Sequence, residues 1–507
     1  MSKISAMVLG VVVLLAGAVV AGAWQTGKRL ESVLQASIRA TNQTLSAGLP
    51  GLAAVPSLEL LSLERGLFSS TAHYRVTLAD AGSDERGSSV AGKRSATAGE
   101  LLFVDHIEHG PFPLSRIIRL QLLPVMATSN FALQASSGVS QWFAAASNGV
   151  APLSGRASLD YQQNLSGTVQ MQPLDFSHGG ARLSSSGAIL DFAVTYQQST
   201  VTFDGRFGSL VFSAADGTRV ELQDLSLLST GTLGESGLYL GHSDSTLKQL
   251  RVQVPEQPAW LLTNLRHQGQ LGEDQTGVFG SFSAALGMLN YAGQDLGALS
   301  AGGSVSHLDT AAVKALNEFY SERVTAPGAF SATSRLPNFD LTAQQQAQLQ
   351  ASLDRLLAGQ PVVTLEHLAL RTAHGESRFN LAVQLKQPDA YAVPASALLL
   401  QMLDTLEARL VLSQPMLKDL IVHLAAQDPA ADPRLSNQQA QQMVLMATQV
   451  AVGSKLVVLE DSDLTASLNY AQGQVDFNGR KMPVEVFADL LSALFSGAAL
   501  DTPTDAR

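Results

Sequence analysis

The chain has 507 residues, a formal net charge of −11 at pH 7 and no cysteine. This length exceeds one ordinary hydrophobic core, so two or three domains are expected. The missing cysteines exclude disulfides, zinc–thiolate sites and cysteine nucleophiles, and an acidic chain without a long basic run lacks the surface of a nucleic-acid-binding protein.

The first predicted element is an uncharged segment of 21 residues, Ile4–Trp24. As a helix with a rise of about 1.5 Å per residue, it would be roughly 30 Å long and would match the hydrocarbon thickness of a bilayer. The aromatic residue at its end stands where an interfacial side chain belongs. We therefore predict a transmembrane anchor over residues 1–24, with membrane-facing residues Ile4, Val8, Leu9, Val12, Leu14, Leu15, Val19 and Trp24.

A cleaved signal peptide is the alternative interpretation of this segment. Residues 21–23 (Ala-Gly-Ala) have the small-x-small form of a cleavage site. The apolar core is longer than the usual 7–15 residues, roughly, of a signal peptide, which favours the anchor. Charge does not fix the orientation, because Lys3 precedes the segment while Lys28 and Arg29 follow it.

A juxtamembrane helix is predicted over residues 25–49, followed by a β-rich region over residues 50–323. Charged residues make up only 15% of the chain, compared with about 25% in typical soluble proteins, and this suits long, half-buried sheets. Gly-containing turns, including Arg65–Ser70, Asp204-Gly205 and Asp216-Gly217, separate segments of alternating apolar and polar residues. Strands are predicted at 57–63, 72–78, 157–161, 167–172, 188–196, 199–203, 209–213, 222–228 and 247–254.

The C-terminal part reads as mixed α+β over residues 338–497, after a linker over 324–337 and before a disordered tail over 498–507. Helices are predicted at 310–322, 342–357, 396–412, 415–426, 437–452 and 483–495, and hairpins at 364–383 and 464–477. The Gln/Ala-rich helices could pair with each other or with a second copy, so a homo-oligomer stays open. The predicted fold class is α+β and β-rich: a single N-terminal transmembrane helix, a large antiparallel meander that could be curved or grooved, and a mixed C-terminal third.

Two clusters of ionisable residues invite a metal-binding interpretation. In His106-Ile107-Glu108-His109, prolines follow at once and prevent a helix, and on a strand residues three apart face opposite sides. A loop fixed by His109–Pro113, with Phe112 in the core, is favoured instead. Glu460–Asp463 lacks EF-hand spacing and favours a solvated turn. No GxSxG, P-loop, GxGxxG or HExxH motif occurs, so no catalytic residue, metal or cofactor is predicted.

Three short motifs occur in order: Gly22–Lys28 (GAWQTGK), Arg65–Ser70 (RGLFSS) and His109–Leu114 (HGPFPL). Together with the Asn-Gly pair at 478–479, they resemble the YdgA-like family of bacterial envelope proteins, a family of unknown function. The resemblance runs nearly end to end. It implies a single-pass inner-membrane anchor, a body in the periplasm and no catalytic residues. The motif residues, for which a structural role is expected, are Gly27, Lys28, Arg65, Gly66, Phe68, Ser69, His109, Gly110, Pro111, Phe112, Pro113, Asn478 and Gly479.

The expected function is that of a non-enzymatic, membrane-anchored periplasmic protein in envelope maintenance. It would contact the bilayer through its N-terminal helix and bind a lipid or an envelope protein partner. Long amphipathic sheets on a membrane tether can curl into an apolar groove, as in AsmA-like envelope proteins, although a closed sandwich is the simpler expectation. A structural or oligomeric scaffold and a periplasmic hydrolase with a site assembled from distant residues are the alternatives.

Overall fold

The computed structural model describes residues 35, 38–39, 42, 54–66, 68–80, 100–136, 139–145, 150–324, 342–391, 393, 395–425 and 433–488. The chain divides into two compact units: unit 1 is Met1–Pro255 with Lys314–Leu349, and unit 2 is Glu256–Val313 with Gln350–Arg507. The predicted anchor, the predicted tail and the predicted linker beyond residue 324 lie outside the described residues. Within the described part, no helix has both the length and the hydropathy needed to cross a membrane.

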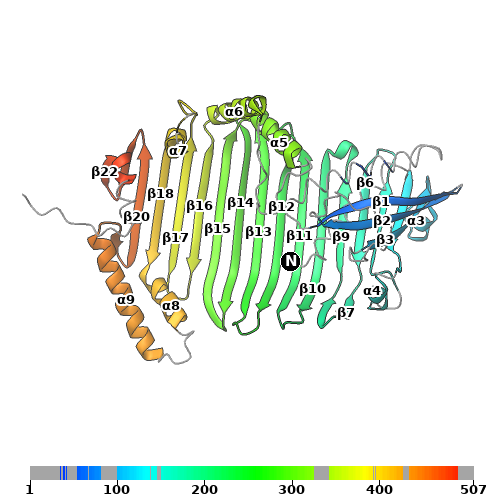
Figure 1. The fold of residues 1–507 in the computed structure, drawn as a ribbon, viewed down its shortest axis with the longest axis horizontal. Helices are drawn as coiled ribbons and strands as arrows, with labels where there is room; N and C mark the ends of the chain where they lie inside the picture. The colour runs from blue at the N-terminus through cyan, green and yellow to red at the C-terminus, as the bar shows by residue number, and fades with distance from the viewer. Residues whose placement is uncertain are drawn as a thin grey trace, which may run out of the picture. The chain divides into compact units, whose positions relative to one another are not determined.

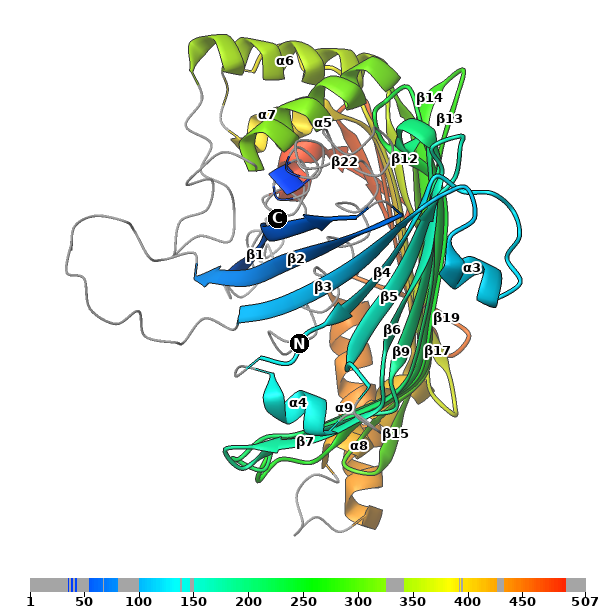
Figure 2. The same cartoon turned by 90° about the vertical axis from the view of Figure 1, so that its right-hand side faces the viewer.

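Unit 1 is an antiparallel sheet (Figure 1). Its strands pair in the order β1-β2-β3-β4-β5-β6-β9-β10-β11-β12, and the β7–β8 hairpin joins β10 through β8. Strands β1, β2 and β3 splay away from the strands that follow them (Figure 2). The elements are β1 (Ala54–Arg65), β2 (Ser69–Asp80), β3 (Glu100–His109), α3 (Leu114–Ile118), β4 (Ala127–Leu133), α4 (Ser140–Ala145), β5 (Leu153–Leu159), β6 (Leu165–Met171), β7 (Leu174–His178), β8 (Ala181–Ser185), β9 (Ala188–Val194), η2 (Tyr196–Gln198), β10 (Thr200–Ser213), β11 (Arg219–Leu233) and β12 (Tyr239–Gln253).

A fully buried core lies on one face of the first strands of unit 1. Alternate residues of β2, β3 and β4 point into it, and Tyr74, Phe103 and Phe131 are at most 1% exposed. Ile38, from the predicted juxtamembrane helix, packs into the same core. The described residues of that segment are helical. The Asn42 amide accepts from the Leu58 N–H and donates to the Leu58 carbonyl, both at 2.9 Å, which ties the segment to β1.

Unit 2 is also built on an antiparallel sheet, in the order β13-β14-β15-β16-β17-β18-β20. Strand β20 also pairs with β19 and β21, and β22 completes a hairpin with β21. Helices α5 (Thr310–Val324) and α6 (Ala343–Ala358) contribute residues to both units. The other elements are β13 (Trp260–Asp274), β14 (Gly277–Tyr291), β15 (Gln294–Leu308), β16 (Val362–Arg371), β17 (Glu376–Leu385), α7 (Ala395–Met402), β18 (Leu403–Ser413), α8 (Gln414–Ala425), α9 (Pro433–Gly453), β19 (Val458–Glu460), β20 (Asp463–Ala471), β21 (Gln474–Phe477) and β22 (Arg480–Pro483).

The structure confirms the β-rich antiparallel class and most of the predicted elements. The hairpins β1–β2, β16–β17 and β20–β21 pair as expected. Helices α5, α6, α8 and α9 lie within a few residues of their predicted bounds. The acidic stretch at 460–463 forms the turn between β19 and β20. Of the helix predicted at 483–495, residues 484–488 are described and helical.

Two predicted boundaries are wrong. Asp204-Gly205 is not a turn, because both residues pair with β9 and β11 inside the continuous strand β10. The helix predicted over 396–412 ends at Met402, and Leu403 begins β18. The pairing of β18 with β17 and β20 satisfies its backbone on both sides, which outweighs the helical pattern of its residues.

Two long strands contain a residue with positive φ in their middle. Asp224 in β11 has φ 50° and Asn264 in β13 has φ 55°, a conformation that Asn and Asp tolerate better than most residues. The apolar residues change phase at each point. In β11, Val220 and Leu222 precede Asp224, while Leu225 and Leu227 follow it. Such a kink lets one face of a sheet stay apolar although the simple alternation of the sequence is interrupted.

Candidate functional site

One face of the unit 2 sheet is apolar over most of its width. Because side chains two residues apart share a face of a strand, the registers place Leu265, Leu286, Leu299 and Leu370 in one row across β13 to β16. We refer to this surface as the apolar face. On β14 to β17 it has no charged side chain, and its larger members are Phe282, Leu286, Leu299, Val305, Val363, Leu365, Leu368, Leu370, Phe379, Leu381 and Val383.

Glycine contacts confirm which residues share the apolar face. A Cβ added at Gly303 would meet the ring of Phe282 at 2.9 Å, and one added at Gly280 would meet the side chain of Leu271 at 3.3 Å. The opposite face is polar: Ser283, the neighbour of Phe282 in β14, is exposed there. The unit 2 sheet is thus amphipathic across its thickness, with its apolar side chains collected on one side.

The apolar face is covered at one end and partly accessible at the other, where Leu286 is buried but other large members are exposed. At the β18–β20 end, Tyr470, Val475 and Phe487 are buried and pack with neighbouring apolar side chains. Toward β13 to β16, Phe282 is 44% exposed and Leu368 is 47% exposed. Unit 2 therefore forms an open sheet here and not the closed sandwich of the simpler expectation. Large apolar side chains that stay accessible on one face make this a candidate binding surface.

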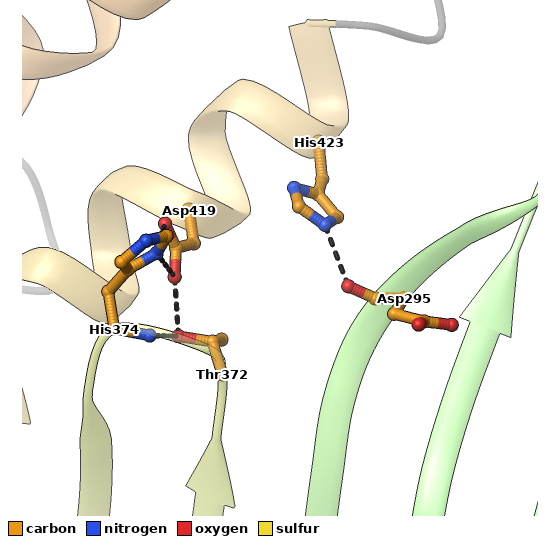
Figure 3. Close-up of polar contacts among 5 residues, drawn as sticks. All are labelled: Asp295, Thr372, His374, Asp419 and His423. Carbon is orange, nitrogen blue, oxygen red and sulfur yellow. Dashed lines mark hydrogen bonds and ion pairs between the residues drawn. The ribbon is translucent and has the colours of Figure 1, made fainter.

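A polar cluster lies where the β16–β17 turn meets α8 (Figure 3). Asp419 on α8 accepts a hydrogen bond from Thr372 Oγ1 at 2.6 Å, and one of its oxygens lies 2.8 Å from His374 Nδ1. The His374 side chain is 71% exposed, whereas that of Asp419 is 16% exposed. One turn further along α8, His423 Nε2 donates to the Asp295 carbonyl at 2.7 Å. These contacts hold a turn and a strand against the helix.

An aspartate–histidine pair can act as a general base when a nucleophile lies within reach of the imidazole. Within the described ranges, no serine or threonine hydroxyl hydrogen-bonds to the His374 ring, and Thr372 is directed at Asp419 instead. The same residues contain no group of three or more His, Asp or Glu side chains placed to hold a metal ion. We therefore interpret the cluster as a structural connection. No local pattern in the sequence points to this cluster, because His374 and Asp419 are 45 residues apart.

Two of the motifs singled out in the sequence meet beside β2 and β3. The His109 N–H donates to the Phe68 carbonyl at 2.9 Å, and His109 Nε2 lies 3.0 Å from Ser70 Oγ. Burial lowers the pKa of His109. Gly110 donates to the Met126 carbonyl at 2.7 Å, and an added Cβ there would lie 1.7 Å from a backbone oxygen, so no other residue fits. The predicted fixed loop is therefore present.

Other motif residues fall in separate places. Phe112 is 55% exposed, so its predicted position in the core is wrong. Asn478 and Gly479 have φ 52° and 81° and form the two-residue turn between β21 and β22, as expected for an Asn-Gly hairpin. The Asn478 side chain also accepts from the Ser467 N–H at 2.8 Å. Gly27 and Lys28 lie outside the described residues.

A buried carboxyl group lies in the core of unit 1. Asp105 is fully buried on β3, and its Oδ1 accepts from Ser129 Oγ at 2.7 Å. Its Oδ2 and the nearby Tyr74 hydroxyl have no hydrogen-bond partner. Burial raises the pKa of Asp105 to about 7 and also raises the pKa of Tyr74. Asp105 occupies an apolar position of β3, between Phe103 and Ile107, so the sequence signal for this site is a carboxylate within an apolar alternation.

The fold and these sites define a β-rich protein with an open amphipathic sheet and no catalytic cluster among the residues described above. The chain belongs to the family described as bacterial protein of unknown function (DUF945), whose model matches residues 1–485. It is 26% identical to protein YdgA of Escherichia coli (strain K12) over 98% of both chains. This confirms the resemblance found in the motifs.

A second relative is the uncharacterized protein YihF of Escherichia coli (strain K12). It is 20% identical, over 94% of this chain and 97% of its own. No solved structure matches the chain. Both similarities extend over nearly the full length, so the fold described here, with its amphipathic sheet, is expected to be shared by these relatives.

Proposed function

We propose that this protein is a non-enzymatic, membrane-anchored protein of the bacterial envelope, with its body in the periplasm, that binds the acyl chains of a lipid on the apolar face of unit 2. The observation that carries this proposal is the apolar face itself. It is uncharged from β14 to β17, and Phe282 and Leu368 are nearly half exposed on it. The uncharged segment Ile4–Trp24 supplies the proposed anchor in the inner membrane.

The dimensions of the apolar face suit an extended hydrocarbon chain. Neighbouring strands lie about 4.8 Å apart, so the five strands β13 to β17 span about 19 Å. A chain lying across them would contact apolar side chains along most of its length, and each buried methylene contributes about 0.8 kcal/mol. A protein partner normally adds polar contacts around an apolar centre. The lack of charged side chains from β14 to β17 therefore favours an acyl chain over an envelope protein.

The proposal is tested by photocrosslinking of the intact chain with a phospholipid that carries a diazirine in its acyl chain. Phe282→Asp places a carboxylate on the apolar face and is expected to lower labelling at least about tenfold, since burying an unpaired charge against methylenes costs well over 1.4 kcal/mol. Ser283→Asp is the matched control, because it adds the same charge one residue away on the polar face. Equal labelling of both variants would contradict lipid binding here and would leave a protein partner or a scaffold as the function.

A further inference from the structure

A second apolar surface lies in unit 1, on the segment Pro111–Pro124 between β3 and β4. Leu120 is 83% exposed, Leu123 is 78% exposed, and Phe112, Leu114, Ile118 and Leu122 are each more than half exposed. Large apolar side chains at this density are unusual on a water-facing loop. They do not reflect poor packing of the strands, because β3 and β4 on either side contribute Phe103 and Phe131 to the buried core.

The same segment carries positive charge in an acidic protein. It contains Arg116 and Arg119 and no acidic residue, whereas the whole chain has a net charge of −11. Burial is the largest cause that lowers the pKa of Arg119. The positive charges of Arg156 on β5 and of Arg116 lower this pKa further, while the charge of Glu108 opposes the shift. Arg116, Arg156 and Glu108 therefore all lie close enough to act on the charge of Arg119. Among the described residues, none of these arginines has a carboxylate within 4.0 Å.

Several backbone N–H groups of the segment donate to carbonyls within it. The N–H groups of Arg116 and Ile117 donate to the Pro113 carbonyl, and those of Arg119, Leu120 and Gln121 donate to the carbonyls of Arg116 and Ile117. The Ser115 N–H donates to the Glu108 carboxylate. Pro111, Pro113 and Pro124 have no N–H to satisfy. A segment that bonds its own amides can leave water at a smaller cost than an open loop.

We propose that the segment Pro111–Pro124 inserts its apolar side chains into the interface of an anionic phospholipid bilayer. Arg116, Arg119 and Arg156 would then lie at the level of the lipid phosphates. The charge complementarity decides between partners, because apolar side chains flanked by cations fit an anionic lipid surface, which attracts each arginine. This contact involves unit 1 only and does not depend on acyl-chain binding by unit 2.

The absence of cysteine allows a direct test with the intact chain reconstituted in vesicles. A single cysteine at Leu120→Cys is labelled with an environment-sensitive fluorophore, and the matched control is Ala215→Cys in the exposed β10–β11 turn. In phosphatidylcholine vesicles with phosphatidylglycerol, the label at 120 is expected to show blue-shifted emission and quenching by doxyl-labelled lipid, while the label at 215 shows neither. Leu123→Cys gives the same readout if the first variant does not fold.

The role of the arginines is tested in the same vesicles. Adding Arg119→Gln to Leu120→Cys is expected to reduce the doxyl quenching at least twofold. Leu120→Cys with its native arginines should also show reduced quenching when the vesicles contain phosphatidylcholine alone. Aqueous emission from the labels at 120 and 123, equal to that at 215, would overturn the membrane contact. Quenching that is unchanged both by the lipid charge and by the Arg119 substitution would overturn the anionic-lipid assignment. The photolabelling of the apolar face is read out separately, so either proposal can fail alone.

Discussion

The first strands of unit 1 and the long strands of unit 2 share one sequence pattern but differ in how far their apolar side is covered. In both, apolar residues alternate with polar ones along antiparallel strands. In unit 1 the apolar side is closed, and Tyr74, Phe103 and Phe131 are almost completely buried. In unit 2 the apolar side stays partly open around Phe282 and Leu368. Alternation therefore indicates which side of a sheet is apolar, and it does not indicate what covers that side.

The largest expected effect separates these two surfaces by stability. Phe131→Ala is expected to lower the free energy of unfolding by about 4 kcal/mol, since it removes buried contacts and leaves a cavity. Phe282→Ala removes the same atoms from a ring that is 44% exposed and is expected to cost about 1 kcal/mol. Urea unfolding of the intact chain, followed by circular dichroism, measures both. Equal losses would show that the apolar face is as well covered as the core.

The next expected effect concerns the buried carboxyl of unit 1. Burial raises the pKa of Asp105 from 3.8 to about 7, so between these pH values the folded protein holds a proton that the unfolded chain has released. Stability therefore falls as pH rises through this window, by up to about 4 kcal/mol for a shift of this size. Asp105→Asn cannot titrate and is expected to remove most of this dependence.

The comparison of Asp105→Asn with the native protein at pH 5 and pH 8 isolates this group, because the other titrations cancel in the difference. The variant should gain relative stability at pH 8. An unchanged difference between the two pH values would contradict this prediction, because it would show that Asp105 does not titrate between pH 5 and pH 8.

The smallest expected effect concerns the more exposed polar cluster of unit 2. Asp419→Ala leaves Thr372 and His374 without their acceptor and is expected to cost about 1 kcal/mol, the usual net value of lost hydrogen bonds at a partly exposed site. His374→Ala should cost less than about 0.5 kcal/mol, because its imidazole is mostly in water. Thermal unfolding of both variants checks this order. A larger loss for His374→Ala would indicate a role beyond the connection between turn and helix.

Much of the fold could be predicted because local patterns agree with the final pairing. Asn478-Gly479 marks its hairpin directly, and the Gln/Ala-rich segments form α6 and α9. The long strands were harder, because Asp224 and Asn264 shift the apolar phase in mid-strand and interrupt the alternation. Strand β13 was missed for this reason, and β14 and β15 were missed because small residues dilute their pattern. The strand β18 begins at Leu403 because its residues pair with β17 and β20, and the local sequence does not contain this information.

The candidate sites show the same limit. The motif residues His109 and Phe68 could be recognised as important, but only the strand pairing shows that they meet. Phe112 was placed in the core because the turn fixed by His109–Pro113 was expected to direct it inward, whereas it is exposed together with the rest of the segment Pro111–Pro124. The apolar face required the registers of several strands at once. Its rows join residues that are far apart in the sequence, such as Leu265 and Leu370, whose positions differ by 105.

The bond between Asn42 and Leu58 has a consequence for aggregation. In the described part of the chain, β1 pairs with β2 alone, so its other side is the edge of a sheet. A free edge is a template on which a second chain can add a strand. The Asn42 amide accepts from the N–H of Leu58 and donates to its carbonyl, as one residue of a neighbouring strand would. A single side chain thereby occupies the bonding position at which an incoming chain would begin to pair.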